Sequence, residues 1–357
     1  MRYGVPYQGS KNKIAEWVID NLPEDEILVD LFAGGCAVTH AALLSGKWDR
    51  IVANDIGDAP ELFCDAIEGK YADEKRWISR EDFQNLKDTD PYVALCWSFG
   101  NNRRTYLYAQ EIEPWKKALH YARVLGDNSL LLETGIDSDG SPADIKANEA
   151  EYKEKYIRWW LSKQKYIFLD SNKLITNDKL NIKENKDKGG QYFISSLKKS
   201  ELKSIEKLQS AQRLECVQSL QRLQSLERLE SLERLQSLER LESLQKYKNN
   251  LTITRKSYAD VAVPDNAVVY ADPPYEGTDQ TGYKCDFDYA AFEKWLNEVP
   301  FMVIVSEYNA PEGCVEIASI KKQSTLAQGN KGRTNTEKLF VQERFYNEYL
   351  QKMGRLF

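Results

Sequence analysis

The stretch EILVDLFAGGCAV, residues 26–38, contains the pattern that decides the fold. A short apolar run leads into two glycines, and these are followed by AVTHAALLSG, residues 37–46, which has the composition of a helix. A second apolar run, RIVANDI at residues 50–56, comes next and contains an acid near its end. Strands that alternate with helices along a chain predict an α/β fold with a parallel sheet.

The C-terminal part of the chain returns to the same alternation. The predicted elements are strands at residues 267–275, 301–309 and 337–345, and a helix at residues 288–299. Near the N-terminus, KIAEWVIDNL at residues 13–22 has helical spacing of its apolar residues. We therefore expect residues 1–70 and 251–357 to form one domain, a Rossmann-like sheet flanked by helices, with the middle of the chain as an insertion.

The middle of the chain has a different character. Residues 71–196 are rich in Tyr, Trp, Lys and Asn and contain long polar links. This composition predicts a mostly helical, loop-rich region that is separate from the sheet.

A leucine repeat occupies much of residues 197–250. From Leu202 to Leu244 every third residue is apolar, and the last nine of these fifteen positions are leucine. Coiled-coil seams average 3.5 residues instead. A three-residue step falls short of an α-helical turn by about 60°, whereas it matches the turn of a 3₁₀-helix. Two structures stay open: an α-helical or broken-helix arrangement, and a long 3₁₀-like rod. The segment is either a duplicated spacer or a rod that serves DNA contact or self-association.

Composition narrows the class of protein. The chain is 42% hydrophobic, which is enough for a sizeable core, and it has no apolar run long enough for a membrane span. The N-terminal residues lack the apolar region of a secretory signal. Six scattered cysteines without a Cys-x-x-Cys pair are expected to be reduced thiols. These features predict a cytoplasmic protein, and two histidines in the whole chain give no basis for a metal site.

The segment ADPPY, residues 271–275, has the chemistry to hold a planar amino group. Its prolines stiffen the backbone and lack N–H groups, so the carbonyl oxygens there remain free to accept hydrogen bonds. Asp272 adds a carboxylate acceptor, and Tyr275 adds an aromatic face. Two acceptors beside a stacking face suit the exocyclic amine of a nucleobase. Acceptors on both N–H bonds favour a pyramidal nitrogen, whose lone pair can then attack an electrophile.

The glycine turn and the acid after the next strand predict a second binding feature. A turn with glycines lets the backbone approach a ligand closely, although the stretch is neither G-x-G-x-x-G nor a P-loop. Asp55, at the end of the second predicted strand, is placed to accept hydrogen bonds from ribose hydroxyls. Together they indicate a site for a nucleoside-containing cofactor.

Five separated motifs carry a resemblance to a known family. In chain order they are PYQGSK (6–11), DLFAGGCAV (30–38), SYAD (257–260), DPPY (272–275) and NTEKLFV (335–341). In this order they resemble the DNA adenine-N6 methyltransferases of the Dam type, the alpha-ordered group of amino-methyltransferases. Tyr7 and Lys11 stand at the aromatic and lysine positions of the first motif, and Cys36 replaces the second glycine of F-x-G-x-G. The resemblance covers about residues 1–60 and 251–345.

The resemblance implies a cofactor, a site and a substrate. The methyl donor would be S-adenosylmethionine, without a metal, and the substrate would be double-stranded DNA with the target adenine flipped out of the helix. The implied catalytic residues are Asp272, Pro273, Pro274 and Tyr275. The implied cofactor-binding residues are Tyr7, Gly9, Lys11, Asp30, Phe32, Gly34, Asp55, Ser257, Tyr258 and Asp272.

The insertion is expected to contact DNA, because the family carries its target-recognition region at this position. CWSFGNNRRTYLY, residues 96–108, interleaves aromatic residues with two arginines. Arginines suit phosphate or guanine, and aromatic rings suit stacking or wedging beside a flipped base. The predicted DNA-binding residues are Trp97, Arg103, Arg104 and Tyr106.

Three alternatives to a site-specific DNA adenine-N6 methyltransferase remain at this point. The same pocket chemistry would serve cytosine N4 or RNA adenine, whereas a carbon-5 cytosine enzyme would need a Pro-Cys pair that the chain lacks. The third alternative is a DNA-binding or assembly protein in which the leucine repeat is the functional part. The expected setting is a bacterial or phage-infected cell, with or without a restriction partner.

Overall fold

The computed structural model describes most of the chain, in two compact units. The described residues are 3–110, 113–132, 229–275, 287–323 and 334–355, with the backbone of four short strands between residues 166 and 193. The first unit is Met1–Leu107 with Arg234–Phe357, and the second is Tyr108–Glu233. The unit with the sheet thus also contains residues 71–107 and 234–250.

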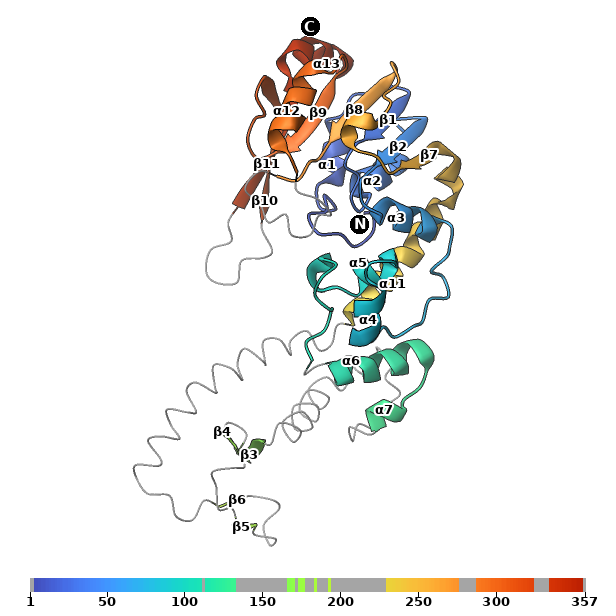
Figure 1. The fold of residues 1–357 in the computed structure, drawn as a ribbon, viewed down its shortest axis with the longest axis vertical. Coiled ribbons are helices and arrows are strands. Elements are labelled where there is room, and N and C mark those ends of the chain that lie inside the picture. Colours follow the sequence, from blue (N-terminus) through green and yellow to red (C-terminus); the bar gives the residue numbers. More distant parts are fainter. Residues whose placement is uncertain are drawn as a thin grey trace, which may run out of the picture. The chain divides into compact units, whose positions relative to one another are not determined.

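A seven-stranded sheet forms the centre of the first unit (Figure 1). In sheet order the strands are β10 (Cys314–Gln323), β11 (Thr334–Gln342), β9 (Val303–Glu307), β8 (Ala267–Ala271), β1 (Ile27–Asp30), β2 (Arg50–Asn54) and β7 (Leu251–Thr254). The five strands from β9 to β7 run parallel, and β11 is antiparallel to both of its neighbours. The predicted α/β sheet, built from both ends of the chain, is therefore confirmed.

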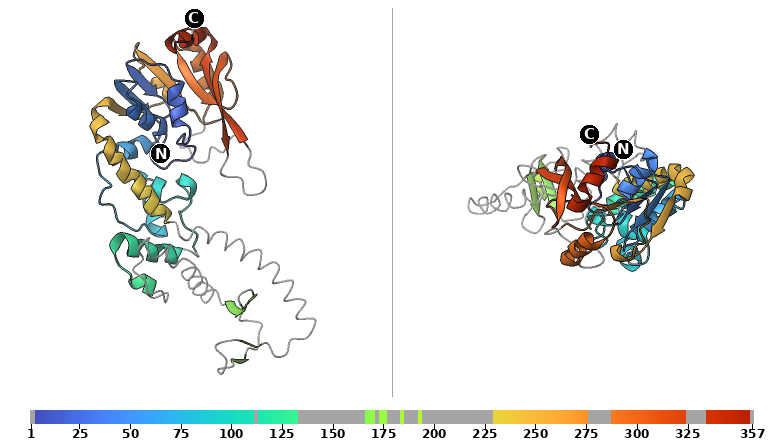
Figure 2. Two further views of the ribbon diagram at one scale, coloured as in Figure 1. Left: turned by 180° about the vertical axis from the view of Figure 1, so that it is seen from behind. Right: turned by 90° about the horizontal axis from the view of Figure 1, so that it is seen from above.

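The central strands are apolar because the sheet is covered on both faces. Ile27 and Val29 of β1 lie in one cluster with alternate residues of β8 and β9. Phe292 and Leu296 of α12 (Tyr289–Glu298) pack into that cluster, and Figure 2 shows α12 beside the sheet. The helix predicted at residues 288–299 thus covers one face of β1, β8 and β9.

The opposite face of the sheet is covered by helices from both ends of the chain. Thr39, on α2 (Ala37–Ser45), donates a hydrogen bond to Asp30, whose side chain points away from the α12 face. Helix α1 (Ala15–Asp20) packs against α2. Tyr349, on α13 (Tyr346–Lys352), donates to the Asn21 carbonyl just after α1. The sheet therefore lies between two helical layers.

Three further helices and three 3₁₀ turns among the described residues complete the first unit. They are α3 (Ala59–Ile67), α4 (Arg80–Leu86), α5 (Pro91–Cys96), and the 3₁₀ turns η1 (Phe99–Asn101), η5 (Tyr258–Asp260) and η6 (Glu343–Phe345). Helix α4 begins with a reciprocal capping box between Ser79 and Asp82. Asp90 caps α5, and Pro91 occupies its first turn.

The end of the leucine repeat joins the first unit. Helix α11 (Glu230–Glu239) continues into an eleven-residue 3₁₀-helix, η4 (Arg240–Asn250), which packs against α2 and α3. The side chains of Leu235, Leu238, Leu241 and Leu244 are all buried. Both geometries that the three-residue spacing left open are thus present in succession. Residues 201–228 lie outside the described residues, so a rod over the whole repeat stays a prediction.

The second unit begins with helices, as expected for the insertion. Its elements are α6 (Glu113–His120), the π-helical turn η2 (Tyr121–Leu125), α7 (Ser129–Leu132), and the paired strands β3 (Tyr166–Asp170) with β4 (Lys173–Thr176) and β5 (Lys183–Glu184) with β6 (Tyr192–Phe193). The composition did not predict these strands. The buried Lys116 ammonium pairs with Glu230 at 3.0 Å, and the Tyr108 hydroxyl donates to Ser231 at 2.9 Å.

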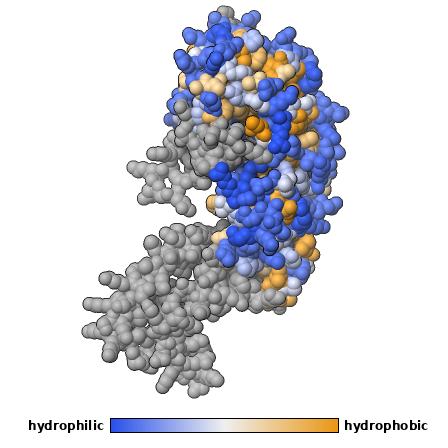
Figure 3. All heavy atoms as spheres, in the orientation of Figure 1, coloured by the Kyte–Doolittle hydropathy of each residue, from blue (hydrophilic) through white to orange (hydrophobic). Residues whose placement is uncertain are grey.

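The described residues contain no helix that could span a membrane. Figure 3 shows a mainly hydrophilic face with small hydrophobic patches over the described residues.

Candidate active site

Three acidic side chains meet at the carboxyl end of the sheet. Asp30 ends β1, while Asp55 and Asp272 directly follow β2 and β8, the two strands on either side of β1. The chain leaves β1 toward β2 and later returns to β8 on the other side. This edge is therefore a topological switch point, where open α/β sheets bind ligands.

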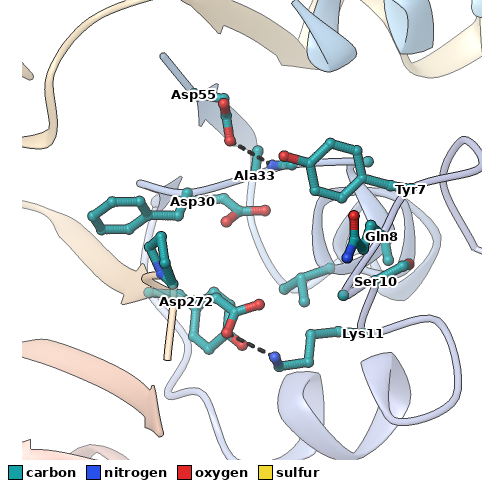
Figure 4. A pocket seen from close by; sticks show the side chains of 16 residues that line it. Tyr7, Gln8, Ser10, Lys11, Asp30, Ala33, Asp55 and Asp272 are labelled. Atoms are coloured by element: carbon teal, nitrogen blue, oxygen red, sulfur yellow. Dashed lines mark hydrogen bonds and ion pairs between the residues drawn. The ribbon is translucent and has the colours of Figure 1, made fainter. Parts of the chain in front are cut away.

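A pocket lies at this edge (Figure 4). Its wall includes most of the residues that the motifs indicated: Tyr7, Gly9, Lys11, Asp30, Phe32, Gly34, Asp55, Asp272 and Pro274. It also includes residues that the sequence did not single out, among them Gln8, Ser10, Val38 and Tyr270. The first, second and fourth motifs thus contribute to one cavity within the first unit.

The glycine turn after β1 forms one wall of the pocket. Gly34 has a φ of +47°, and its neighbour Gly35 lies against Tyr7, where an added Cβ would come within 2.5 Å of the Tyr7 Cβ. Cys36 has a φ of 58°, in the left-handed region that normally favours glycine. The thiol is fully buried. The turn therefore keeps a glycine-like backbone at Cys36, where this chain has cysteine in place of the second glycine of the motif.

Asp55 ties this turn to the end of β2. One of its carboxylate oxygens accepts the Gly34 N–H at 2.9 Å, and the other accepts the Gly57 N–H at 2.7 Å. Burial raises the pKa of Asp55, and the two backbone N–H groups act against this rise. A carboxylate oxygen can accept more than one hydrogen bond, so Asp55 retains capacity for a ligand hydroxyl.

Asp30 presents a buried acceptor to the pocket. One of its oxygens accepts the Thr39 hydroxyl at 2.7 Å, whereas the other has no hydrogen-bond partner among the described residues. Burial raises the pKa of Asp30 to about 7. A buried acceptor without a partner is costly, so a ligand with N–H or O–H donors or a positive charge fits this wall.

Lys11 pairs with two carboxylates beside the pocket, the half-buried Asp272 and the buried Glu337. Its ammonium lies 2.7 Å from Asp272 and 3.3 Å from Glu337. Burial alone acts to lower the pKa of Lys11, but the two carboxylates outweigh it, so the pKa lies above its ordinary value. Burial raises the pKa of Asp272, and Lys11 acts in the opposite direction. Lys11 is therefore a buried cation that holds Asp272 at the pocket wall.

Tyr275 is fixed at both its ring and its hydroxyl. The hydroxyl donates to Glu337 and lies 2.9 Å from the Ser306 Oγ. Burial, followed by the nearby Asp272 and Glu337 carboxylates, raises the pKa of Tyr275 well above its usual value, so the hydroxyl keeps its proton. The Lys11 ammonium lies 4.4 Å from the ring centre. Stacking of this ring on a base stays a prediction.

The remaining motif residues lie around the pocket. Tyr258 is absent from the pocket wall and packs instead against Phe32, with ring centres 5.5 Å apart. Ser257 precedes η5, and its carbonyl accepts the Asp260 N–H. Pro273 lines a second, adjacent cavity together with residues of α12 and of the segment after β9. The functional roles of Ser257, Tyr258 and Pro273 therefore stay predictions. Tyr258 is placed to support Phe32, which lines the pocket.

The four predicted DNA-contacting residues differ in exposure. Trp97 and Tyr106 are buried, at 0% and 3% exposure, and the Tyr106 hydroxyl donates to the Ile78 carbonyl at 2.7 Å. Arg103 is half-buried and pairs with Asp58. Arg104 is exposed. The structure thus places two of the four residues inside the fold and leaves Arg104 open to solvent.

These residues belong to one loop. A bridge between Ser98 and Tyr106 closes it, and Phe99 at its start is 65% exposed. Arg234 of α11 donates to the carbonyls of Cys96 and Ser98, each at 2.8 Å. The loop, residues 98–106, is thus anchored at its base by the end of the leucine repeat.

Sequence reasoning missed Glu337 and Ser306 as site residues. A signal for Glu337 existed, because residues 337, 339 and 341 share one face of a strand. Leu339 and Val341 are apolar, so an acid on the same face is exceptional and needs a buried partner. Within the described residues, no cluster of three His, Cys, Asp or Glu side chains is arranged to hold a metal.

Comparisons with known proteins agree with this geometry. The sequence profile of the family described as D12 class N6 adenine-specific DNA methyltransferase matches residues 7–163 and 230–312, which is more than half of the chain. Type II methyltransferase M2.HphI of Haemophilus parahaemolyticus is 43% identical over 53 residues, a stretch that covers 15% of this chain and 15% of that protein.

Proposed function

Because the chain belongs to the D12 class N6 adenine-specific DNA methyltransferase family, we propose that it transfers a methyl group from S-adenosylmethionine to the N6 amine of adenine in double-stranded DNA. The observation that carries the proposal is the position of Asp272. It lies in the wall of an acidic pocket, at a strand end, and is held there by a buried lysine at 2.7 Å.

The pocket suits S-adenosylmethionine by its charge and its hydrogen-bond acceptors. Asp30, Asp55 and Asp272 line it, and Asp30 has a buried acceptor without a partner in the described part of the chain. The cofactor is a cation with an amine and two ribose hydroxyls, and when bound it supplies an electrophilic methyl group. The residues proposed to hold it are Tyr7, Gly9, Lys11, Asp30, Phe32, Gly34 and Asp55, with Tyr258 supporting Phe32.

Asp272 and the DPPY backbone would activate the target amine. We infer that the Asp272 carboxylate and a neighbouring carbonyl oxygen accept the two amine hydrogens of the flipped adenine. This removes the lone pair from conjugation with the ring. The bound cofactor would supply the methyl group, and Asp272 is placed to take the proton that the amine must lose when it accepts that group. The ring of Tyr275 would contact the base.

DNA contact is proposed for the exposed part of loop 98–106. Arg104 is exposed there, and the exposed ring of Phe99 is available to stack on a base or fill a gap in the helix. Trp97 and Tyr106 would support the loop from inside, and Arg103 would tie it to α3 through Asp58. The residues proposed to contact DNA directly are therefore Phe99 and Arg104. The buried Trp97 and Tyr106 are proposed only to support the loop.

Site specificity is part of the proposal. The relative in H. parahaemolyticus is named a Type II methyltransferase, a class that suggests methylation at a defined DNA sequence and a restriction partner. Only a short stretch is shared with that protein, so both features are extensions of the family assignment. The fold proposed to carry them is a Rossmann-like methyltransferase sheet with the second unit contributing to target recognition.

Sequencing of modified bases tests the function. A bacterial host without its own adenine methylation would express the wild-type chain, Asp272→Ala, or Asp265→Ala, which changes an exposed acid outside the pocket. We expect N6-methyladenine in one sequence context with the wild type and with Asp265→Ala, and none with Asp272→Ala. Methylation of cytosine N4 would replace the proposal with the cytosine alternative, and unmodified DNA together with unmodified RNA would refute an enzymatic role.

A further inference from the structure

Glu337 joins three segments that are far apart in the sequence. It lies on β11, and its carboxylate accepts the hydroxyl of Tyr275, from the turn after β8, and the hydroxyl of Ser306, from β9, at 3.1 Å. The same oxygen lies 3.3 Å from the ammonium of Lys11, in the N-terminal segment. All of these contacts are within the first unit, and the Glu337 side chain is only 1% exposed.

Burial of these charged groups costs free energy. A need of the site for their exact positions would explain why the fold keeps them there. A carboxylate loses its hydration when it is buried, and an ion pair in the interior recovers this only with good geometry and further hydrogen bonds. Lys11 already has Asp272 at 2.7 Å, so the cluster places two carboxylates beside one ammonium. Apolar side chains on the same strand, Leu339 and Val341, show that this face of β11 otherwise packs as core.

The contacts of Glu337 restrain two groups of the DPPY turn: Asp272, which lines the pocket, and Tyr275, which does not. Through its ion pair it acts on the Lys11 ammonium that holds the Asp272 carboxylate, and through the phenol hydroxyl it restrains the direction in which the Tyr275 side chain points. A hydrogen bond at the far end of an aromatic side chain restrains the whole ring, because only two torsions separate the ring from the backbone.

We propose that Glu337 is a positioning residue for methyl transfer, which acts through Lys11 and Tyr275 to hold Asp272 and the Tyr275 ring in reactive geometry. The proposal rests on the proposed function, since it concerns the same pocket. Glu337 does not line the pocket, and in this proposal it acts on the reaction only through Lys11 and Tyr275. Its removal therefore lowers the rate of the chemical step much more than it weakens binding.

Glu337→Gln tests this, because glutamine keeps the shape of the side chain and its acceptor oxygen but removes the charge. The matched control is Glu316→Gln on the adjacent strand β10, where Glu316 pairs with Lys338 at the surface. We expect Glu337→Gln to lower kcat about tenfold to a hundredfold, the range for small misplacement of catalytic groups. We expect KM for DNA and calorimetric Kd for S-adenosylmethionine to change less than threefold. Glu316→Gln should match the wild type.

The pH profile gives a second measurement that a merely structural role would not change. The charged and titratable groups that face the Lys11 ammonium are Asp272, Glu337 and the phenol of Tyr275. Removal of the Glu337 charge takes away one of the two groups that raise the pKa of Lys11. The alkaline limb of the kcat profile of Glu337→Gln should therefore shift to lower pH than that of the wild type.

Tyr275→Phe keeps the proposal testable if Glu337→Gln does not fold. It retains the ring but removes the hydroxyl, and it should lower kcat with little change in cofactor Kd. Where both single variants fold, the loss in the double variant should be smaller than the sum of the two single losses, because the two side chains contact each other directly. Wild-type kcat in Tyr275→Phe, or in a folded Glu337→Gln, would overturn the inference. A wild-type chain that methylates no DNA would instead overturn the proposed function.

Discussion

The Lys11 ammonium lies 2.7 Å from the Asp272 carboxylate and thereby connects the N-terminal segment to the turn after β8. Both side chains line the same pocket, and the side chain of Lys11 is 7% exposed. The pair links the two ends of the chain at the point where the chemistry is proposed to occur. Its loss should therefore affect the stability of the fold as well as the activity.

Lys11→Met should destabilise the protein strongly. The change keeps the length of the side chain but removes the ammonium that neutralises Asp272 and Glu337, and breaking a buried ion pair costs about 3–5 kcal/mol. Lys338→Met removes a surface partner of Glu316 and should cost less than about 1 kcal/mol. Urea unfolding at pH 8 measures both, and equal free energies of unfolding for the two variants would contradict this account of the cluster.

Asp30 should make the protein less stable as the pH rises. Burial raises its pKa to about 7, above the value near 4 of an unfolded chain. Between these two values the folded state binds more protons than the unfolded state, so the free energy of unfolding falls as the pH rises through this window. Asp30→Asn has no such titration. From pH 4 to pH 8 the free energy of unfolding of the wild type should fall relative to that of Asp30→Asn. A difference between the two that stays constant with pH would show that the pKa of Asp30 is not raised by folding.

Substitutions of Cys36 test whether the backbone of the turn after β1 is strained. A left-handed residue with a side chain is strained by about 1–2 kcal/mol, and glycine relieves this but loses the buried thiol and costs chain entropy. Cys36→Gly should therefore stay within about 1 kcal/mol of the wild type. Cys36→Val adds a β-branch where φ is 58° and should be clearly less stable and bind S-adenosylmethionine more weakly. Thermal unfolding and calorimetry measure the two effects, and a stable Cys36→Val would argue against the strained turn.

We expect Arg103 to stabilise the fold and Arg104 to contact DNA. Arg104→Ala should weaken binding to a DNA duplex and lower the slope of log affinity against log salt by about 1. Arg103→Ala removes the partner of Asp58 and should lower the free energy of unfolding by about 2 kcal/mol. Fluorescence anisotropy at several salt concentrations, with urea unfolding beside it, distinguishes the two. The reverse assignment would mean that the loop presents its other arginine to DNA.

Local sequence patterns predict the strand ends well because the chemistry there is contiguous. DPPY directly follows β8, and the glycine turn directly follows β1, so each motif is fixed to the sheet by its own strand. Parallel pairing then brings Asp30, Asp55 and Asp272 to one edge without further information.

Other features depend on contacts between distant segments. Trp97 looks like a stacking residue in its local context, but the fold buries it against Trp77. The role of Glu337 requires knowledge that β11 pairs with β9, which places it beside Ser306 and Tyr275. The sequence does not predict β10, because its polar residues suit the edge strand that it forms and lack the apolar run of a central strand.

The 3₁₀ segment at the end of the repeat has a consequence for how this chain can vary. In η4, Leu241 and Leu244 lie one turn apart and are both buried. Gain or loss of a single triplet of residues there returns the next leucine to the same inward face. An α-helix would need seven or eleven residues for the same result. Homologues should therefore tolerate length changes in multiples of three at this site, and a single-residue insertion should turn the leucines outward.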